Sequence, residues 1–410
     1  MCIRDRGDVA DYINGRAFKP IEWETTGKPI IRIQNLTNSS TEINRTTKTF
    51  EEKYSVRAGD LLFAWSASLG AYIWNGEDGW LNQHIFKVIP KKDISKKYLY
   101  YYLLHVVDQL YAKAHGSGMV HITIKPFKAT TIPLPPLPEQ QRIVDRIESL
   151  FAKLDEAKQK AQDALDSFET RKAAILHKAF TGELTAQWRK EHGVGMESWA
   201  RHPLKDVTQI GSGGTPSRKN SQYYLGDILW VKTGEIYWNY IYDSEEKITE
   251  EAIANSSAKL YPAGTVLVAM YGQGLTRGRS AILGVPATTN QAVCALQPCD
   301  RLGNRYLYYY FMANYWEYRE KAVGGNQPNY SATMIGKWII NIPSVLEQAE
   351  IVRILDDLLA KEQQAKEVAE AVLEQIDLIK KSILARAFRG ELGTNDPAEE
   401  SAVELVRNII

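Results

Sequence analysis

The chain has 410 residues, of which 24% are charged and 44% hydrophobic, and this length is enough for two or three folded domains. Fifty Lys and Arg against 49 Asp and Glu leave a formal charge of +1, which excludes a uniformly basic nucleic-acid coat protein and an acidic solvating protein. Three cysteines without a CxxC pair argue against a disulfide framework, and no apolar stretch has the length of a secretion signal or a membrane span. We therefore expect a globular cytoplasmic protein.

The first segment, residues 1–138, is predicted to be a mixed α/β domain. Short runs of β-branched and aromatic residues predict strands at 30–33, 61–65 and 85–89, and residues 98–114 predict a helix. The first six residues match the start of a later, similar domain poorly. One hypothesis is that they replace a short native lead-in.

Residues 139–184 predict a long helix. Between Glu139 and Phe180 there is no Pro, Gly, Tyr or Trp, and apolar residues recur at heptad spacing. Three prolines upstream prevent an earlier start, and Gly182 stands where a C-terminal cap is expected. About 42 residues at 1.5 Å per residue would form a rod of about 63 Å. The two heptad series are Ile143, Leu150, Ala157, Ala164 and Ile147, Leu154, Ala161, Phe168, Ile175.

The second half has the same organisation. After a linker at residues 185–198, residues 199–346 predict another mixed α/β domain, with strands at 228–231 and 265–269 and a helix at 306–323. Residues 347–392 predict a second long helix, which a capping box of Ser344 and Glu347 would begin, and residues 393–410 form a tail. Its heptad series are Ile351, Leu358, Ala365, Val372, Ile379 and Leu355, Ala369, Ile376, Ile383, with Glu362 as the interruption.

The chain is an internal repeat with a displacement of 208 positions. Glu139-Gln140-Gln141-Arg142-Ile143-Val144 recurs as Glu347-Gln348-Ala349-Glu350-Ile351-Val352, and Ala179–Leu184 falls on Ala387–Leu392 without a gap. The expected fold class is therefore mixed α/β domains alternating with two long antiparallel coiled-coil helices, in a tandem repeat with pseudo-twofold symmetry. Two independent helical hairpins, or an ordinary dimerisation coiled coil, are the alternatives.

Catalytic motifs are weak in this sequence. Asn326-Gln327-Pro328-Asn329-Tyr330 departs from the Asn-Pro-Pro-Tyr loop of amino-methyltransferases, and the glycines at 211–214 lack the Lys-Ser or Lys-Thr ending of a phosphate-binding loop. The seven histidines show no HExxH or other close ligand pair, so we expect no metal site and no catalytic residue.

The globular segments instead carry basic and amide side chains among aromatic residues, which is the inventory for phosphate contacts and base-edge hydrogen bonds. Two similar but diverged domains at a fixed separation could read two half-sites on one face of DNA. The DNA-binding candidates are Arg32, Gln34, Asn35, Arg45, Lys48, Ser66, Gln83, His84, Lys125, Thr215, Ser217, Lys232, Tyr237, Tyr271, Gln273, Arg277, Arg279, Gln291, Asn326 and Gln327.

These features resemble the specificity subunit (HsdS) of type I restriction-modification systems. The resemblance rests on Ile132–Val144, where a proline-led Glu-Gln motif opens a long helix, on the Ala-Phe-x-Gly-Glu-Leu close at 179–184, and on their echoes from Ile342 to Leu392. Gly214-Thr215-Pro216-Ser217 also resembles the family's motif at the start of a recognition domain. The first half lacks this match near Asn14-Gly15.

The resemblance implies two target-recognition domains that each choose half of a bipartite sequence in double-stranded DNA, with two helices as spacer. It also implies partners, namely two methyltransferase subunits and, in complexes that cleave, restriction subunits. S-adenosylmethionine, ATP and Mg would bind in those subunits, and this chain would hold no cofactor and perform no chemistry. Candidates for the partner surface are Arg142, Arg146, Lys153, Phe180, Glu183, Glu350, Asp356, Phe388 and Glu391. The alternatives are a coiled-coil adaptor without DNA readout, and a DNA methyltransferase or nuclease.

Overall fold

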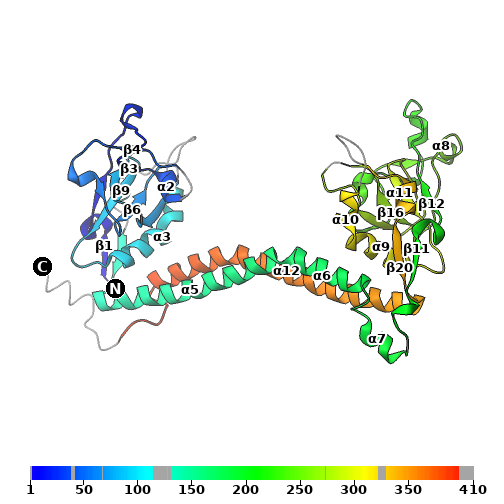
Figure 1. Ribbon diagram of the computed structural model, residues 1–410. Coiled ribbons are helices and arrows are strands. Elements are labelled where there is room, and N and C mark those ends of the chain that lie inside the picture. Colours follow the sequence, from blue (N-terminus) through cyan, green and yellow to red (C-terminus); the bar gives the residue numbers. More distant parts are fainter. Residues whose placement is uncertain are drawn as a thin grey trace. The chain divides into compact units, whose positions relative to one another are not determined.

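A computed structural model describes residues 2–37, 42–66, 68–113, 127, 131–272, 274–321 and 329–396. The chain forms two compact units. Unit 1 consists of residues 1–162 and 370–410, and unit 2 consists of residues 163–369. Figure 1 shows the elements of both.

Unit 1 contains two four-stranded sheets, with strand orders β2-β9-β6-β7 and β4-β3-β8-β5, and a separate antiparallel pair of β1 with β10. Its strands are β1 (Cys2–Asp5), β2 (Ala10–Asn14), β3 (Lys28–Ile31), β4 (Arg45–Thr46), β5 (Ser55–Val56), β6 (Leu61–Ala64), β7 (Gly70–Ile73), β8 (Gly79–Leu81), β9 (Ile85–Pro90) and β10 (Thr131–Leu134). Its helices include α1 (Arg6–Val9), α2 (Ile33–Thr37), α3 (Lys96–Lys113) and the 3₁₀ turns η1 (Pro20–Glu22) and η2 (Glu52–Tyr54).

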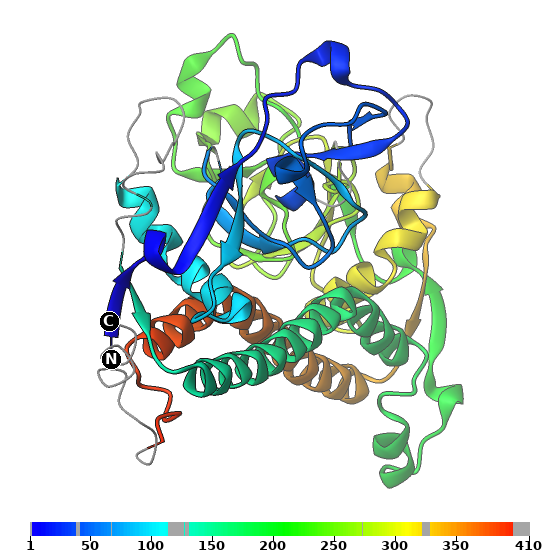
Figure 2. The same cartoon turned by 90° about the vertical axis from the view of Figure 1, so that its left-hand side faces the viewer.

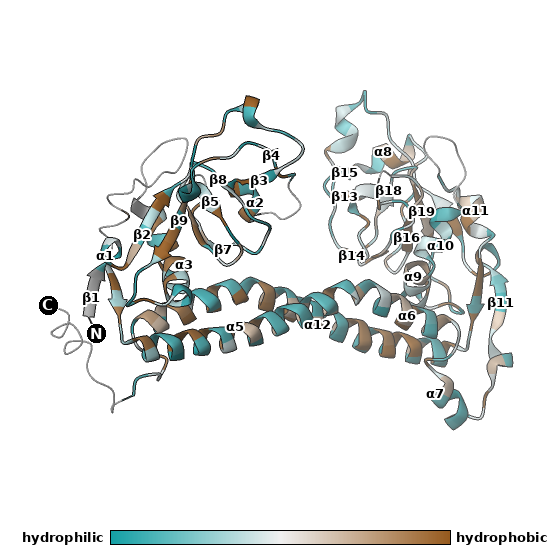
Figure 3. Cartoon of the chain, turned by 60° about the vertical axis from the view of Figure 1, so that its left-hand side comes forward, coloured by the Kyte–Doolittle hydropathy of each residue, from teal (hydrophilic) through white to brown (hydrophobic). Residues whose placement is uncertain are grey.

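The core of unit 1 lies between the sheet around β9, which is coloured hydrophobic in Figure 3, and the helix α3. β6 alternates its buried side chains between two clusters, because Leu61 and Phe63 point to the α3 side while Leu62 points to the other sheet. The hydroxyl of Tyr98 donates to the carbonyl of Pro133 at 2.8 Å, which ties α3 to β10.

Two long helices, α5 (Leu137–Asp166) and α12 (Val345–Phe388), contribute residues to both units. In unit 1 the start of α5 packs on α3 and on the end of α12, as Figure 2 shows. Ile143 and Ile147 share a core with Leu384 and Phe388, and further along α5 Asp155 accepts from Lys380 at 2.6 Å. Residues later in α5 therefore contact residues earlier in α12, so the two segments run antiparallel.

Unit 2 contains a five-stranded sheet of order β12-β19-β16-β17-β14, a three-stranded sheet of order β15-β13-β18, and the antiparallel pair of β11 with β20. Its strands are β11 (Ala200–Pro203), β12 (Ile210–Ser212), β13 (Ile228–Val231), β14 (Tyr240–Ile241), β15 (Lys247–Ile248), β16 (Val266–Ala269), β17 (Ser280–Leu283), β18 (Thr288–Thr289), β19 (Val293–Leu296) and β20 (Ile339–Ile342). Its helices include α6 (Phe168–Phe180), α7 (Ala186–Glu191), α8 (Glu250–Ala254), α9 (Asn304–Ala313), α10 (Tyr315–Glu320), α11 (Ala332–Gly336) and the 3₁₀ turns η3 (Met196–Ser198), η4 (Leu204–Asp206), η5 (Ser221–Tyr224) and η6 (Thr233–Glu235).

The core of unit 2 joins this sheet to α9, α6 and the first half of α12. Leu176 of α6 lies in the same core as Ile351 and Leu355 of α12. Nearer the other end of α6, Arg171 donates to Glu362 at 2.8 Å and Lys366 lies over the ring of Phe168. α6 and α12 are therefore antiparallel within unit 2.

The repeated Glu-Gln motif makes the same contacts in each unit. In unit 1 the Gln140 side chain accepts from the backbone of Ser95 at 2.8 Å and donates to the carbonyls of Asp93 and Pro135, both at 2.9 Å. In unit 2 the corresponding bonds of Gln348 lead to Gly303, Arg301 and Pro343. These partners also differ by 208 positions, so the repeat in sequence is a repeat of the joint between helix and globular part.

Several expected elements differ in detail. Ile33 begins α2 rather than ending a strand, and the first long helix is interrupted at Ser167, whose hydroxyl donates to the carbonyl of Asp163 at 2.6 Å. The helix expected at 306–323 is divided into α9 and α10 at Asn314, whose side-chain amide donates to the carbonyl of Tyr310 at 2.8 Å. The heptad series of α12 drifts, leaving Ile379 41% exposed, because a straight helix turns by 3.6 rather than 3.5 residues.

Candidate nucleic-acid interface

Arg32 stands directly after β3 in unit 1 and faces an exposed indole. Its guanidinium carbon lies 5.2 Å from the ring centroid of Trp23, the residue that follows η1. The backbone N–H of Arg32 donates to Oδ1 of Asn35 at 3.0 Å. The Asn35 side chain is buried, whereas that of Gln34 is exposed on α2. This turn therefore presents Arg32 and Gln34 and uses Asn35 to hold its shape.

The other described candidates of unit 1 are not gathered in one place. Arg45 donates to the carboxylate of Glu77 and, at 2.8 Å, to the carbonyl of Gly27, and the hydrogen bond with Glu77 raises the pKa of Arg45. Lys48 is exposed, Ser66 is buried, and Gln83 and His84 are half-buried, with the His84 ring 5.4 Å from that of Trp65. Lys125 lies outside the described residues.

Lys232 occupies in unit 2 the position that Arg32 has in unit 1, directly after the corresponding strand β13. Its ammonium donates to Glu245 at 2.9 Å and to Glu246 at 3.0 Å, and these hydrogen bonds raise the pKa of Lys232. Two carboxylates therefore neutralise Lys232, which the sequence suggested as a contact for a DNA phosphate. Nearby, Thr215 donates to the side-chain carbonyl of Gln291 and Ser217 is exposed.

Two loops of unit 2 bring predicted residues together. The guanidinium carbon of Arg279 lies 4.9 Å from the ring centroid of Tyr237, which is 57% exposed. Arg277, in the same loop as Arg279, is turned toward the buried Tyr330. Tyr271 is exposed at the start of this loop. Gln273, Asn326 and Gln327 lie outside the described residues.

Hydrogen bonds from α10 hold the loop between β16 and β17. Arg319 donates to the carbonyl of Arg277 at 2.6 Å and to that of Gly274 at 2.7 Å, and the hydroxyl of Tyr315 donates to the carbonyl of Leu275. Gly272 has φ +143°, and a Cβ there would meet Thr276 at 2.7 Å. Residues 274–277 of this loop are therefore held against α10.

Sequence reasoning missed the aromatic surface beside this loop. Trp238 has φ +62°, and among the described residues no other non-glycine has a positive φ. Its N–H donates to the carbonyl of Ser280 at 3.0 Å, and its carbonyl accepts from Tyr308 at 2.6 Å. Tyr240 and Tyr242 are exposed, with nearly parallel rings 6.2 Å apart. The signal in the sequence was the run of aromatic residues from 237 to 242.

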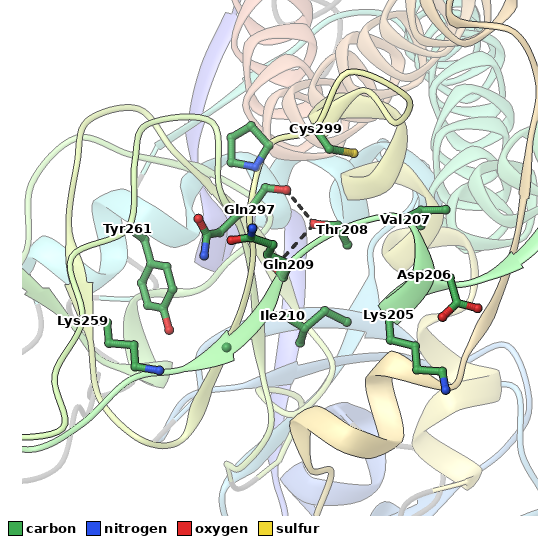
Figure 4. A pocket seen from close by; sticks show the side chains of 12 residues that line it. Lys205, Asp206, Val207, Thr208, Gln209, Ile210, Lys259, Tyr261, Gln297 and Cys299 are labelled. Atoms are coloured by element: carbon green, nitrogen blue, oxygen red, sulfur yellow. Dashed lines mark hydrogen bonds between the residues drawn. The ribbon is translucent and has the colours of Figure 1, made fainter.

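A pocket of about 920 Å³ on the flank of unit 2 holds none of these candidates. Figure 4 shows its lining along β12, with Lys205 and Lys259 on separate segments and Thr208 bonded to Gln297. Over the part of the chain that the structure describes, no three His, Cys, Asp or Glu side chains gather into a possible metal site. Nor is any helix within those residues long and apolar enough to cross a membrane.

The model of the family "Type I restriction modification DNA specificity domain" matches residues 3–165 and 196–373, more than half of the chain. The chain belongs to this family. Each matched region runs from the first strand of a globular part into a long helix, so the chain holds two specificity-domain regions.

Named relatives agree with this family. The EcoBI specificity subunit of Escherichia coli is 25% identical over 419 residues, covering 95% of this chain and 86% of that protein. The MjaIX specificity subunit of Methanocaldococcus jannaschii is 32% identical over 193 residues, covering 45% and 44%. The crystal structure of the HsdS subunit from Thermoanaerobacter tengcongensis has a TM-score of 0.67 at 19% identity, covering 95% of this chain and 97% of that one, which shows a shared fold.

The candidates for a partner surface in this specificity-domain chain fall into two groups. Phe388 packs against Tyr98 and Tyr102, and Phe180 packs against Tyr306, so both hold a helix to its own unit and offer little surface. Asp356 accepts from Arg305 and Tyr309 within unit 2. The remaining candidates are wholly or partly exposed. Three of them are in ion pairs, namely Arg142 with Glu139, Glu350 with Arg353 and Glu391 with Arg389. The other three, Arg146, Lys153 and Glu183, are exposed.

Proposed function

We propose that this chain is the DNA-recognition subunit of a type I restriction-modification complex, in which each unit reads one half of a bipartite site in double-stranded DNA. The observation that carries the proposal is the repeated joint. Gln140 and Gln348 attach the same helix position to the same strand and loop positions in both units, while the loops around Arg32 and Arg279 differ. One scaffold with two unlike surfaces is what an asymmetric site requires.

The paired helices have the further role of spacer. α5 with α6, and α12, would form an antiparallel coiled coil with pseudo-twofold symmetry, whose length sets the gap between the half-sites. Two features support this: both segments are matched in length in the sequence, and both units contain antiparallel helix contacts.

Catalysis belongs to partner subunits in this proposal. Two methyltransferase subunits would dock along the exposed helix faces and bring S-adenosylmethionine, and restriction subunits would bring ATP and Mg. The chain itself would act without a cofactor, on DNA in the cytoplasm. Exposed side chains such as Arg146, Lys153 and Glu183 are the available contacts for the methyltransferase subunits.

Methylation mapping tests the proposal. The full chain, co-expressed with a methyltransferase subunit from the same locus, should produce one bipartite methylated motif, and exchange of residues 193–341 for those of a related chain should change only one half of it. Methyl transfer by the purified chain alone would show an enzyme instead. Absence of any DNA binding at low salt, even with the methyltransferase subunit, would show an adaptor.

A further inference from the structure

Arginines stacked on aromatic rings occur in both units, but most are held by other groups. Arg16 is bonded to Glu22, Arg218 to Glu246 and Arg189 to Glu347. In these arginines a carboxylate already neutralises the charge and accepts N–H donors of the guanidinium. Arg319 donates to loop carbonyls, Arg6 is fully buried, and Arg277 is turned toward the buried Tyr330.

Two of the stacked arginines are different, and there is one in each unit. Arg32 over Trp23 and Arg279 over Tyr237 have guanidinium groups for which the described residues provide no hydrogen bond or ion pair. Both rings lie at the surface, with Trp23 38% and Tyr237 57% exposed. An aromatic ring beneath a guanidinium orients its plane without consuming its N–H donors.

The rings themselves are held in place. In unit 1, η1 precedes Trp23, and Glu22 in this turn accepts from Arg16 at 2.7 Å and from the backbone of Lys19 at 2.8 Å. In unit 2 the left-handed Trp238, bonded through its N–H to Ser280, fixes Tyr237 beside the loop that carries Arg279. A non-glycine residue in this conformation is strained and persists only where the surrounding contacts hold it.

The two arginines do not occupy equivalent positions. The counterpart of Arg32 is Lys232, which Glu245 and Glu246 neutralise. Arg279 instead belongs to the loop at 270–279, whose counterpart between β6 and β7 spans only residues 65–69. Each unit therefore offers one oriented guanidinium from a different element of the same scaffold.

We propose that Arg32 and Arg279 are the base-reading arginines of their units, each donating two N–H groups to O6 and N7 of a guanine in the major groove. This inference rests on the proposed function. It means that each half-site contains at least one guanine, and that Trp23 and Tyr237 are positioning residues that hold the guanidinium plane.

The experiment is selection from random duplex DNA by the full chain with its methyltransferase subunit, followed by sequencing. Arg279→Ala should lower the preference for one guanine in one half-site by roughly ten- to a hundred-fold and leave the other half unchanged, and Arg32→Ala should do the same in the other half. Arg218→Ala is the matched control, because this stacked arginine is bonded to Glu246 and its loss should leave the motif intact.

Further variants separate base reading from phosphate contact. Arg279→Lys should retain affinity and its salt dependence but lose the guanine preference, because lysine is a point charge without a bidentate fork. Tyr237→Phe should keep the preference, whereas Tyr237→Ala should weaken it several-fold without changing the affinity for unrelated duplex. A motif without guanine, or one that Arg32→Ala and Arg279→Ala leave unaltered, overturns the inference. Selection of no bipartite motif by the wild-type chain would instead refute the proposed function.

Discussion

The substitution Glu347→Gln tests how the start of α12 is held in unit 2. The carboxylate of Glu347 accepts from Arg189 at 2.6 Å, from the hydroxyl of Thr185 at 2.7 Å and from the indole N–H of Trp199 at 3.0 Å. The side chains are almost completely buried, with 1% of Glu347 and 8% of Arg189 exposed. Thr185 and Arg189 donate to Oε1 of Glu347 and Trp199 donates to Oε2, so the single oxygen of the amide can accept at only one of these places. The guanidinium of Arg189 also loses its counter-charge.

Breaking a buried ion pair from one side costs about 3–5 kcal/mol, because the remaining charge stays desolvated. The unit 1 counterpart, Glu139, is bonded to Arg142, whose side chain is 35% exposed, and to Thr394. Solvent can stabilise Arg142 when its partner is lost, so Glu139→Gln should cost only about 1 kcal/mol. The two substitutions are thus a matched pair at the same position of the repeat.

Hydrogen–deuterium exchange measures each unit separately. Peptides covering residues 185–199 and 339–347 should exchange at least a hundred-fold faster in Glu347→Gln, since about 3 kcal/mol of opening free energy is removed. Adding Arg189→Met should recover part of this loss, because an apolar side chain replaces the unpaired charge. The reasoning is refuted if Glu347→Gln changes exchange less than about ten-fold, or if Glu139→Gln changes unit 1 equally.

Two other predictions concern η1 and the length of the long helices. Hydrogen bonds from Arg16 and the backbone of Lys19 lower the pKa of Glu22 to about 2. The ionised Glu22 therefore stabilises η1 fully above pH 4.5, the ordinary pKa of a glutamate, and this stabilisation is lost as the pH falls through about 2. Amide exchange of residues 19–23 should show this loss in the wild type and not in Glu22→Gln. Four residues inserted after both Gln162 and Ala369 add about 6 Å to each helix and should widen the methylated motif's gap by one or two base pairs with both half-sites unchanged; altered bases would argue against a spacer.

The helical segments could be predicted from the sequence because their signal is local. Absence of Pro and Gly, heptad apolar residues and a proline-rich start were sufficient, and α5 begins two residues before the expected Glu139. The capping box was half right. Ser344 caps the helix by accepting from the N–H of Glu347 at 3.2 Å, but the Glu347 side chain is bonded to Arg189, which no spacing rule could reveal.

The candidate site was harder to predict because the partners of a surface cation are distant in sequence. Arg45 and Lys232 look like phosphate contacts until the fold brings Glu77 and Glu246 to them. Arg279 has the same composition signal as Arg45, and only the structure shows that Tyr237, far along the chain, lies beneath it and that the described residues provide no acid beside it. Residue type therefore predicted the kind of surface, whereas pairing determined which cations remain available.

The same contacts explain why some residues are repeated in both units and others are not. Residues that join helix to globular part must keep their geometry in both units, and accordingly Gln140 and Gln348, or Tyr98 and Tyr306, donate to corresponding backbone carbonyls. Under the proposal above, residues that meet a base would have no such constraint, because an asymmetric DNA sequence presents different edges to each unit. The position after β3 and β13 shows the consequence: an oriented arginine in unit 1 and a neutralised lysine in unit 2, on strands that pair in the same way. A change of specificity can then arise by moving one guanidinium between loops while the helix joints stay intact.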